Sequence, residues 1–213
     1  MTLFRLDASI RAEGSASREI ADIVVDEWLA THPGDLVERR HVGVDVLPAQ
    51  AWASAVGATY LPEAERTPEQ RSAVSLAATL VDELLAADAI VLAVPLYNFG
   101  VSQHMKAWID LVITDPRAAA GQQPLLAGKS VVLCTVRGGA YGAGTPREGW
   151  DHSTGYLRRI IADVWGAELT LVEREFTLVG VNPALDDFAD AAAFMHTEAL
   201  AAAREVGKAL AVA

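Results

Sequence analysis

The chain has 213 residues, of which 52% are apolar and 21% charged, a balance typical of a globular protein rather than a disordered one. Its net charge of −11 disfavours binding to DNA, RNA or anionic membranes, because such binding relies on lysine and arginine to neutralise phosphates. The sequence has no apolar stretch long enough to span a bilayer and no recognisable secretory signal, and its one cysteine, Cys134, rules out an intrachain disulfide. We therefore expect a single domain, residues 1–213, in the cytoplasm, with no nucleic-acid partner and no membrane insertion.

Strand-like and helix-like patterns alternate along the chain. From the N-terminus they predict a strand at 3–8, a helix at 16–31, a strand at 36–44, a crossover with a short helix within 47–66, a helix at 67–87, a strand at 89–94, a helix at 102–113, a strand at 130–136, a helix at 150–165, a strand at 168–178 and a helix at 185–210. The clearest helix start is Thr67-Pro68-Glu69-Gln70, where Thr67 and Gln70 form a capping box around a proline at the first helical position. Five strands alternating with helices predict an α/β fold with a doubly wound, five-stranded parallel sheet and helices on both faces.

The loop after the first strand is rich in serine. It lacks the G-x-G-x-x-G pattern of dinucleotide-binding folds, but it places Ser9, Ser15 and Ser17 at the start of a helix. Hydroxyls and free backbone N–H groups at a helix N-terminus can bind a phosphate without lysine. The alternative is that Ser15 or Ser17 is only an N-cap.

The third strand is followed at once by Pro95-Leu96-Tyr97-Asn98-Phe99-Gly100. Pro95 is expected to end the strand, and two aromatic rings around an amide suit a flat heteroaromatic ligand at the carboxyl end of a parallel strand. The alternative is that Tyr97 and Phe99 belong to the core.

The fourth strand leads into a segment with four glycines within residues 138–144. Such a segment lets backbone N–H groups line a pocket wall, although it could equally be a plain surface loop. Because parallel strands end at the same edge of the sheet, the three loops are expected to converge.

These motifs resemble the FMN-dependent NADH:quinone oxidoreductases, also called FMN-dependent NADH-azoreductases. The resemblance covers residues 3–177 and is sharpest in Thr67-Pro68-Glu69-Gln70, Pro95-Leu96-Tyr97-Asn98-Phe99, Lys106-Ala107-Trp108-Ile109-Asp110 and Arg137-Gly138-Gly139-Ala140-Tyr141. It implies a flavodoxin-like fold with strand order 2-1-3-4-5. It also implies bound FMN, NADH as the electron donor, a quinone or azo compound as acceptor, and a homodimer with both sites at the subunit interface.

The resemblance also assigns residues to the parts of FMN. The phosphate would lie on Ser9, Ser15, Ala16 and Ser17; the isoalloxazine ring on Leu96, Tyr97, Asn98 and Phe99; and its pyrimidine side on Val136, Arg137, Gly138 and Gly139. The flavin N5 carries the chemistry, by a ping-pong mechanism, and Tyr141 is a candidate proton donor or substrate contact.

The chain departs from the family pattern at four places. Leu96 replaces a frequent methionine, Val136 a frequent serine and Ala16 a polar residue, and the segment 114–127 is short and rich in alanine. The alternative function is a non-enzymatic FMN electron carrier that docks on a redox partner. A hydrolase is disfavoured because the sequence has no G-x-S-x-G motif.

Overall fold

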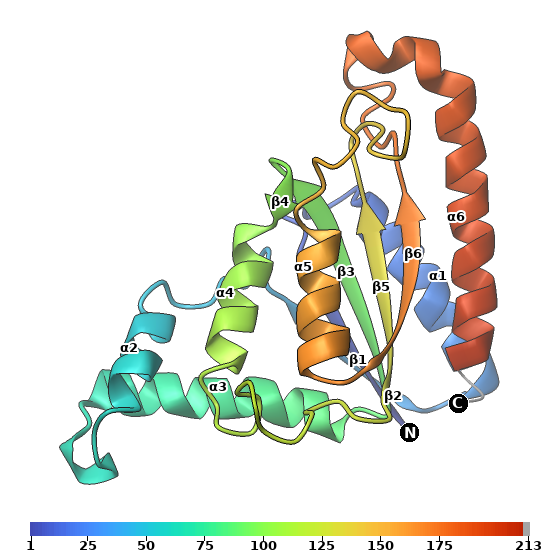
Figure 1. Ribbon diagram of the computed structural model, residues 1–213. Coiled ribbons are helices and arrows are strands. Elements are labelled where there is room, and N and C mark those ends of the chain that lie inside the picture. The colour runs from blue at the N-terminus through green and yellow to red at the C-terminus, as the bar shows by residue number, and fades with distance from the viewer. Residues whose placement is uncertain (211–213) are drawn as a thin grey trace.

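The computed structural model describes residues 1–210 and is built on one parallel sheet with strand order β2-β1-β3-β5-β6 (Figure 1). The strands are β1 (Thr2–Asp7), β2 (Leu36–His41), β3 (Ala89–Tyr97), β5 (Ser130–Val136) and β6 (Glu168–Arg174), and a short β4 (Gly100–Val101) pairs antiparallel with β3. With β4 set aside, this is the expected 2-1-3-4-5 order. The prediction of a doubly wound, five-stranded parallel sheet is therefore confirmed.

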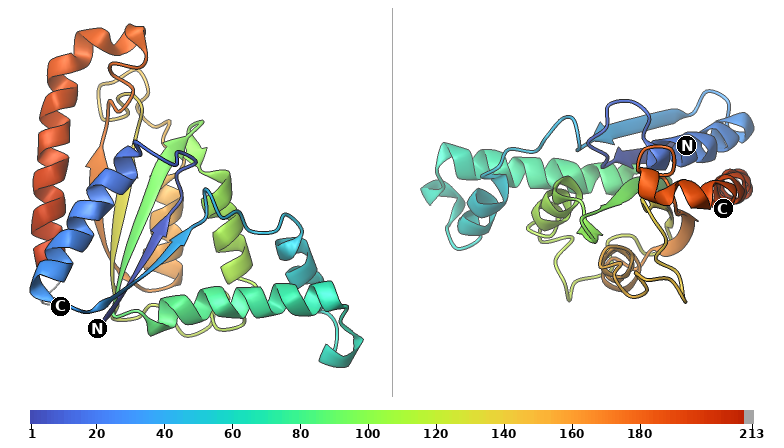
Figure 2. Two further views of the ribbon diagram at one scale, coloured as in Figure 1. Left: turned by 180° about the vertical axis from the view of Figure 1, so that it is seen from behind. Right: turned by 90° about the horizontal axis from the view of Figure 1, so that it is seen from above.

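Helices cover both faces of the sheet, as the view from above shows (Figure 2). One face carries α1 (Ala16–Thr31) and α6 (Ala189–Leu210), and the other carries α3 (Pro68–Ala86), α4 (Gln103–Val112) and α5 (Thr154–Arg158), which continues as a π-helix over Arg159–Val164. The remaining elements are α2 (Ala51–Ala58) and 3₁₀ turns at Glu63–Glu65 and Pro183–Phe188. In Figure 1, α2 and the adjoining end of α3 project away from the sheet.

The core lies on both faces of β3. Residues 89–96 of this strand are buried, as expected for a central strand of a parallel sheet. Trp28 of α1 is fully buried on one side, while Trp108 of α4 and Trp165 are fully buried on the other and meet edge to face, with ring centroids 5.9 Å apart.

Pro95 does not end its strand, and this prediction was wrong. The strand continues to Tyr97, with Pro95 opposite Val136 of β5. The ladder with β1 ends where Asp7 faces Ala93, so beyond that point β3 has only one parallel neighbour. A proline is tolerated where a strand has a free edge, because the missing N–H costs no ladder hydrogen bond there.

Several predicted boundaries also shift because side chains or turns end the elements early. The strand predicted at 36–44 ends at His41, whose carbonyl accepts hydrogen bonds from the N–H groups of Val44 and Asp45. The helix predicted from 150 begins at Thr154, because Asp151 caps the N–H groups of Ser153 and Thr154 at 2.8 and 2.9 Å.

At the C-terminal end of the sheet, β6 stops at Arg174 rather than continuing to 178. Phe176 adopts a positive φ of 57°, which breaks the extended conformation. The N–H groups of Thr177 and Leu178 then bond to the carbonyls of Arg137 and Gly138. The final helix, predicted from 185, is α-helical only from Ala189, after a 3₁₀ turn.

All five parallel strands run in the same direction, so their carboxyl ends share the upper edge of the sheet in Figure 1. No helix within residues 1–210 combines the length and apolar character needed to cross a bilayer.

Candidate active site

A cavity of about 1110 Å³ opens at the carboxyl ends of β1, β3 and β5. The three loops singled out from the sequence meet there, as the parallel topology requires. The predicted site residues that line it are Ser9, Ser15, Ala16, Leu96, Tyr97, Asn98, Val136, Gly138 and Tyr141. The others, Ser17, Phe99, Arg137 and Gly139, lie next to lining residues but do not line it.

The first loop ends in the N-cap of α1. The Ser15 hydroxyl accepts a hydrogen bond from the Arg18 N–H at 3.5 Å and lies 3.2 Å from the hydroxyl of Ser17, which is fully buried. Ser15 is therefore an N-cap. The N–H groups of Ala16 and Ser17 have no partner within an α-helix of this geometry, so they remain available to an anion, which the helix dipole also favours.

Tyr97 fastens the first loop to the end of β3. Its hydroxyl lies 3.1 Å from the Ser9 hydroxyl and accepts a hydrogen bond from the Ile10 N–H at 3.3 Å. Ser9 in turn accepts a hydrogen bond from the Arg11 N–H at 3.2 Å. The two bonds of Tyr97 join segments that are far apart in sequence, and the third bond fixes the turn of the first loop along the cavity wall.

Asn98 and Phe99 form the two-residue turn between β3 and β4, and both have positive φ, 48° and 67°. This is the geometry of a tight hairpin turn that favours Asn and then Gly, so Phe99 is strained, at a cost of about 1–3 kcal/mol. The turn is stabilised from outside: the His152 N–H donates to the Phe99 carbonyl at 2.9 Å. The Phe99 ring also packs edge-on against Trp150, with centroids 5.5 Å apart.

The Arg137 side chain turns away from the main cavity. It donates to Asp151 at 2.7 Å and to Glu173 at 2.6 Å, and it lines a smaller cavity of about 390 Å³ with these acids. Burial opposes its charge, but the hydrogen bonds to Glu173 and Asp151 outweigh this effect and raise the pKa of Arg137. Burial likewise acts to raise the pKa of Asp151, yet hydrogen bonds from Thr154, Ser153 and Arg137 lower it.

The charged lining of the main cavity was missed by the sequence analysis. It consists of Arg11, Arg18, Arg147 and Arg174 beside Glu13, Glu19 and Asp22. Within residues 1–210, the buried Nε atoms of Arg18 and Arg174 have no hydrogen-bond acceptor. Arg11 lies within the serine loop and Arg18 directly follows it, so both could have been noticed there, whereas Arg147 and Arg174 come from segments that only the fold brings close.

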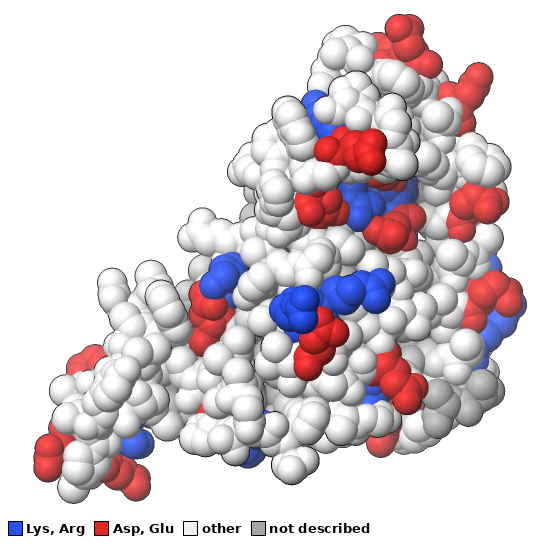
Figure 3. Space-filling model, in the orientation of Figure 1, with Lys and Arg blue, Asp and Glu red and all other residues white. Residues whose placement is uncertain are grey.

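Basic and acidic side chains are otherwise interspersed on the molecular face drawn in Figure 3. The ion pairs Lys106–Asp110 and Arg159–Asp163, with N–O distances of 2.5 and 2.9 Å, are examples.

Two other kinds of chemistry find no support in the site. Cys134 is fully buried in β5, and burial raises the pKa of its thiol to about 12, so it stays protonated at neutral pH. Within residues 1–210, no group of three His, Cys, Asp or Glu side chains is arranged to hold a metal ion. The cavity instead offers anion-binding N–H groups at one end and aromatic, amide and glycine segments at the other.

Proteins of known family resemble this chain over nearly its whole length. A family model described as flavodoxin-like fold matches residues 1–197. An FMN-dependent NADH:quinone oxidoreductase of Frankia alni is 40% identical over 192 residues, which are 88% of this chain and 90% of the relative. One of Streptomyces avermitilis is 33% identical over 96% of each chain. The chain belongs to the FMN-dependent NADH:quinone oxidoreductase family.

Solved structures share the fold of this quinone oxidoreductase family member. An azoreductase of Bacillus anthracis strain Sterne matches it with a TM-score of 0.80 at 21% identity, over 98% of this chain and 99% of that one. An FMN-dependent NADH-azoreductase of Bacillus anthracis strain Ames Ancestor, in complex with FMN, matches with a TM-score of 0.73 at 16% identity, over 97% and 100% of the two chains. The resemblance and the fold expected from the sequence are confirmed.

Proposed function

We propose that this chain binds FMN in the main cavity and is an oxidoreductase that passes a hydride from NADH to quinones or azo compounds by a ping-pong mechanism. The observation that carries the proposal is the pair of hydrogen bonds by which the Tyr97 hydroxyl, at the end of β3 and next to the Asn98-Phe99 turn, holds the loop that leads into the N-terminus of α1. One end of the site thereby suits a phosphate and the other a flat ring system. The names of relatives 40% and 39% identical to this chain specify FMN, NADH and quinone and support the same function.

The cavity fits FMN in size and in donor chemistry. Its volume of about 1110 Å³ lies just above the range of roughly 300–1,000 Å³ usual for small-molecule pockets, so a cofactor would leave room for a second flat molecule. Gly138 is a close-approach position, because a Cβ there would lie 2.6 Å from a methyl carbon of Leu178. A larger residue at this position would have to displace the Leu178 side chain, which lines the same cavity.

The residues would divide the cofactor between them. The phosphate would be held by Ser9, Ser15, Ala16 and Ser17, the last two through their backbone N–H groups. The ring would lie against Leu96, Tyr97, Asn98 and Phe99. The pyrimidine edge of the ring would lie against the backbone of Val136, Arg137, Gly138 and Gly139. For Ser17 and Arg137 the proposal involves main chain only, since the Ser17 side chain is buried and the Arg137 side chain faces Asp151.

When bound, FMN accepts a hydride from NADH at N5 and passes it to the acceptor. The protein's share is electrostatic and positional. N–H groups of Gly138 and Gly139 would donate to the pyrimidine edge, where negative charge builds up. Tyr97, anchored to Ser9, would keep the ring in register with the phosphate loop. Tyr141 lines the same cavity and would contact the second substrate or give it a proton.

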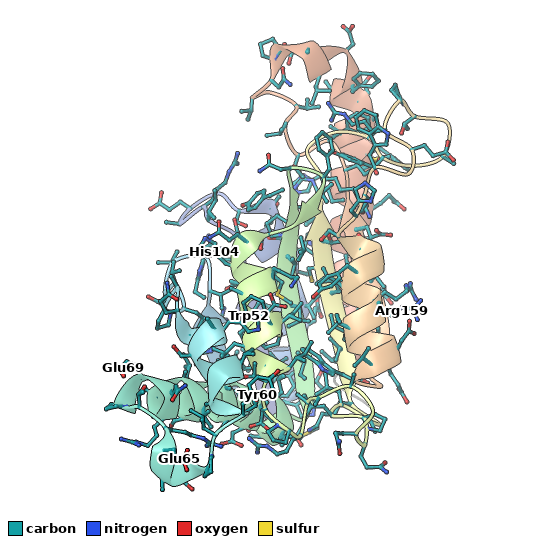
Figure 4. All side chains as sticks on the ribbon, turned by 60° about the vertical axis from the view of Figure 1, so that its left-hand side comes forward. Trp52, Tyr60, Glu65, Glu69, His104 and Arg159 are labelled. Atoms are coloured by element: carbon teal, nitrogen blue, oxygen red, sulfur yellow. The ribbon has the colours of Figure 1, made fainter. Side chains whose placement is uncertain are left out.

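We further propose a homodimer that acts in the cytoplasm, where NADH is available. The projecting α2 carries two exposed aromatic side chains, Trp52 at 52% and Tyr60 just beyond it at 81% exposure (Figure 4). Between α2 and α4 lies a further cavity of about 480 Å³ lined partly by Trp52, Val56 and Ile113. These features are consistent with burial against a second copy. Sedimentation at micromolar concentration tests this, and a monomer there would contradict it.

The deciding experiment is an anaerobic titration of the FMN-loaded protein with NADH, followed by flavin absorbance. Two-electron bleaching that benzoquinone reverses is the expected result. Bound FMN that NADH leaves oxidised would favour the electron carrier instead. Failure to bind FMN would overturn both functions.

A further inference from the structure

Arg5 is an unusual residue for the interior of this sheet. It lies in the middle of β1 and is fully buried, although arginine is seldom buried unless its charge is paired. Its Nε and Nη2 atoms each lie 3.1 Å from Oδ1 of Asp7, and its Nη1 lies 2.5 Å from Oδ1 of Asp22. Nη2 also donates to the Arg18 carbonyl at 3.4 Å.

These partners place Arg5 directly beneath the end of the cavity that suits a phosphate. Asp7 is the last residue of β1, only 5% exposed, and Ala8 and Ser9 follow it. Arg5 and Asp7 point to the same face because they are two residues apart on a strand. Arg18 and Asp22 lie on the first two turns of α1 and line the cavity. Arg5 thus links the strand before the first loop to the helix after it.

The charges show why this link matters for an anion. Asp7 and Asp22 put two carboxylates close to the helix N-terminus, where they would repel a phosphate dianion. Arg5 is the buried cation that faces both. Asp22 also lies 3.9 Å from Arg39, but the Arg39 side chain is half exposed, so solvent and salt screen the effect of its charge.

We infer that Arg5 is a positioning residue for the FMN phosphate. It cancels the charge of Asp7 under the first loop and holds the N-terminal turns of α1 against β1, so that their N–H groups meet the phosphate. This inference rests on the proposed function, since it concerns the same cofactor. It predicts that Arg5 contributes to the binding of the FMN phosphate and contributes little to the binding of the flavin ring.

The test compares FMN with riboflavin, which has the ring but no phosphate. Binding of each is measured by flavin fluorescence quenching in wild-type protein and in Arg5→Met. We expect Arg5→Met to lower the affinity for FMN at least tenfold and to change the affinity for riboflavin less than threefold. The matched control is Arg40→Met. It breaks a partly buried ion pair between Arg40 on β2 and Glu83 on α3, and it should leave the ratio of FMN affinity to riboflavin affinity unchanged.

Two further variants separate charge from structure. Arg5→Met/Asp7→Asn, which leaves no unpaired charge in the interior, should recover much of the lost FMN selectivity. Asp7→Asn alone keeps Arg5, so this test does not require the Arg5→Met variant to fold. It should raise the affinity for FMN several-fold and leave the affinity for riboflavin unchanged.

The outcomes are distinct. Equal weakening of both flavins in Arg5→Met, or an Asp7→Asn variant whose FMN-to-riboflavin ratio does not rise, overturns the inference and leaves the proposed function intact. A wild-type protein that binds neither flavin overturns the proposed function, and the inference falls with it.

Discussion

Gly43 shows how one small residue can set the position of the first loop. It lies beyond the end of β2, and a Cβ at this position would come 2.1 Å from the Ser9 carbonyl oxygen. No such contact is tolerated, so Gly43→Ala must displace the backbone at Ser9 or at residue 43, which disturbs the loop that Tyr97 holds. We expect FMN affinity to fall at least tenfold and stability to fall by about 1–3 kcal/mol.

Fluorescence titration with FMN and urea denaturation measure these two effects of Gly43→Ala. The matched control is Gly155→Ala, because Gly155 lies in α5, has no heavy atom within 4 Å of an added Cβ, and should gain up to about 1 kcal/mol from the better helix former. Unchanged FMN binding in Gly43→Ala would show that the loop tolerates the displacement.

Phe99 tests whether the strained turn beside the cavity stores energy. Replacing Phe99 by alanine or by glycine removes the same ring contacts with Trp150 and Tyr141. Only glycine also relieves the positive φ of 67°. Phe99→Gly should therefore be more stable than Phe99→Ala by about 1 kcal/mol in urea denaturation. Equal stabilities would mean that the turn relaxes to an unstrained geometry once the ring is gone.

At the scale of the elements, α3 provides the clearest case of a local signal that the structure confirms. The Thr67 hydroxyl accepts from the Gln70 N–H at 3.2 Å, and the Gln70 side chain accepts from the Thr67 N–H at 2.9 Å. Thr67→Ala should cost about 1 kcal/mol of stability, measured by urea denaturation. Thr197→Ala is the control: its hydroxyl bonds to the Ala193 carbonyl inside α6, where loss of that bond should be neutral or slightly stabilising. Equal losses in the two variants would argue against a capping role.

Helices and strands were predictable where residues close in sequence determine them. Their predicted ends were wrong where residues distant in sequence determine where the element stops. The strand 130–136 and the helix 16–31 match the structure because their apolar patterns are complete in themselves. The extension of β3 through Pro95 depends instead on where β1 ends, and the stop at Arg174 depends on the hydrogen bonds of Thr177 and Leu178 to the glycine loop.

The same distinction applies to the candidate site. The convergence of the three loops follows from parallel strand order, so most of the named residues line the cavity. Side-chain direction does not follow from it. The sequence could not show that the Arg137 side chain turns to Asp151 and Glu173, because those partners lie 14 and 36 residues away. The role of Tyr97 in fastening Ser9, 88 residues away, was hidden for the same reason.

For the molecule as a whole, FMN binding should be coupled to folding. The site is assembled from segments after β1, β3 and β5, which meet only in the folded state, so an unfolded chain cannot hold the cofactor. At free FMN one hundred times its dissociation constant, the free energy of unfolding should rise by about 2.7 kcal/mol. For a chain of this size that corresponds to a rise of about 5–10 °C in the melting temperature.

Scanning calorimetry with and without FMN measures this rise directly. Because the stabilisation depends on ligand concentration over dissociation constant, Gly43→Ala at the same FMN concentration should show a smaller rise than wild type, whereas Gly155→Ala should show the full one. The FMN-dependent rise in melting temperature therefore reports on the first loop, because a variant that disturbs Ser9 shows a smaller rise even if its apo form is equally stable. A wild-type melting temperature that FMN does not change, at concentrations that saturate fluorescence quenching, would mean that FMN binds the unfolded chain as well as the folded one.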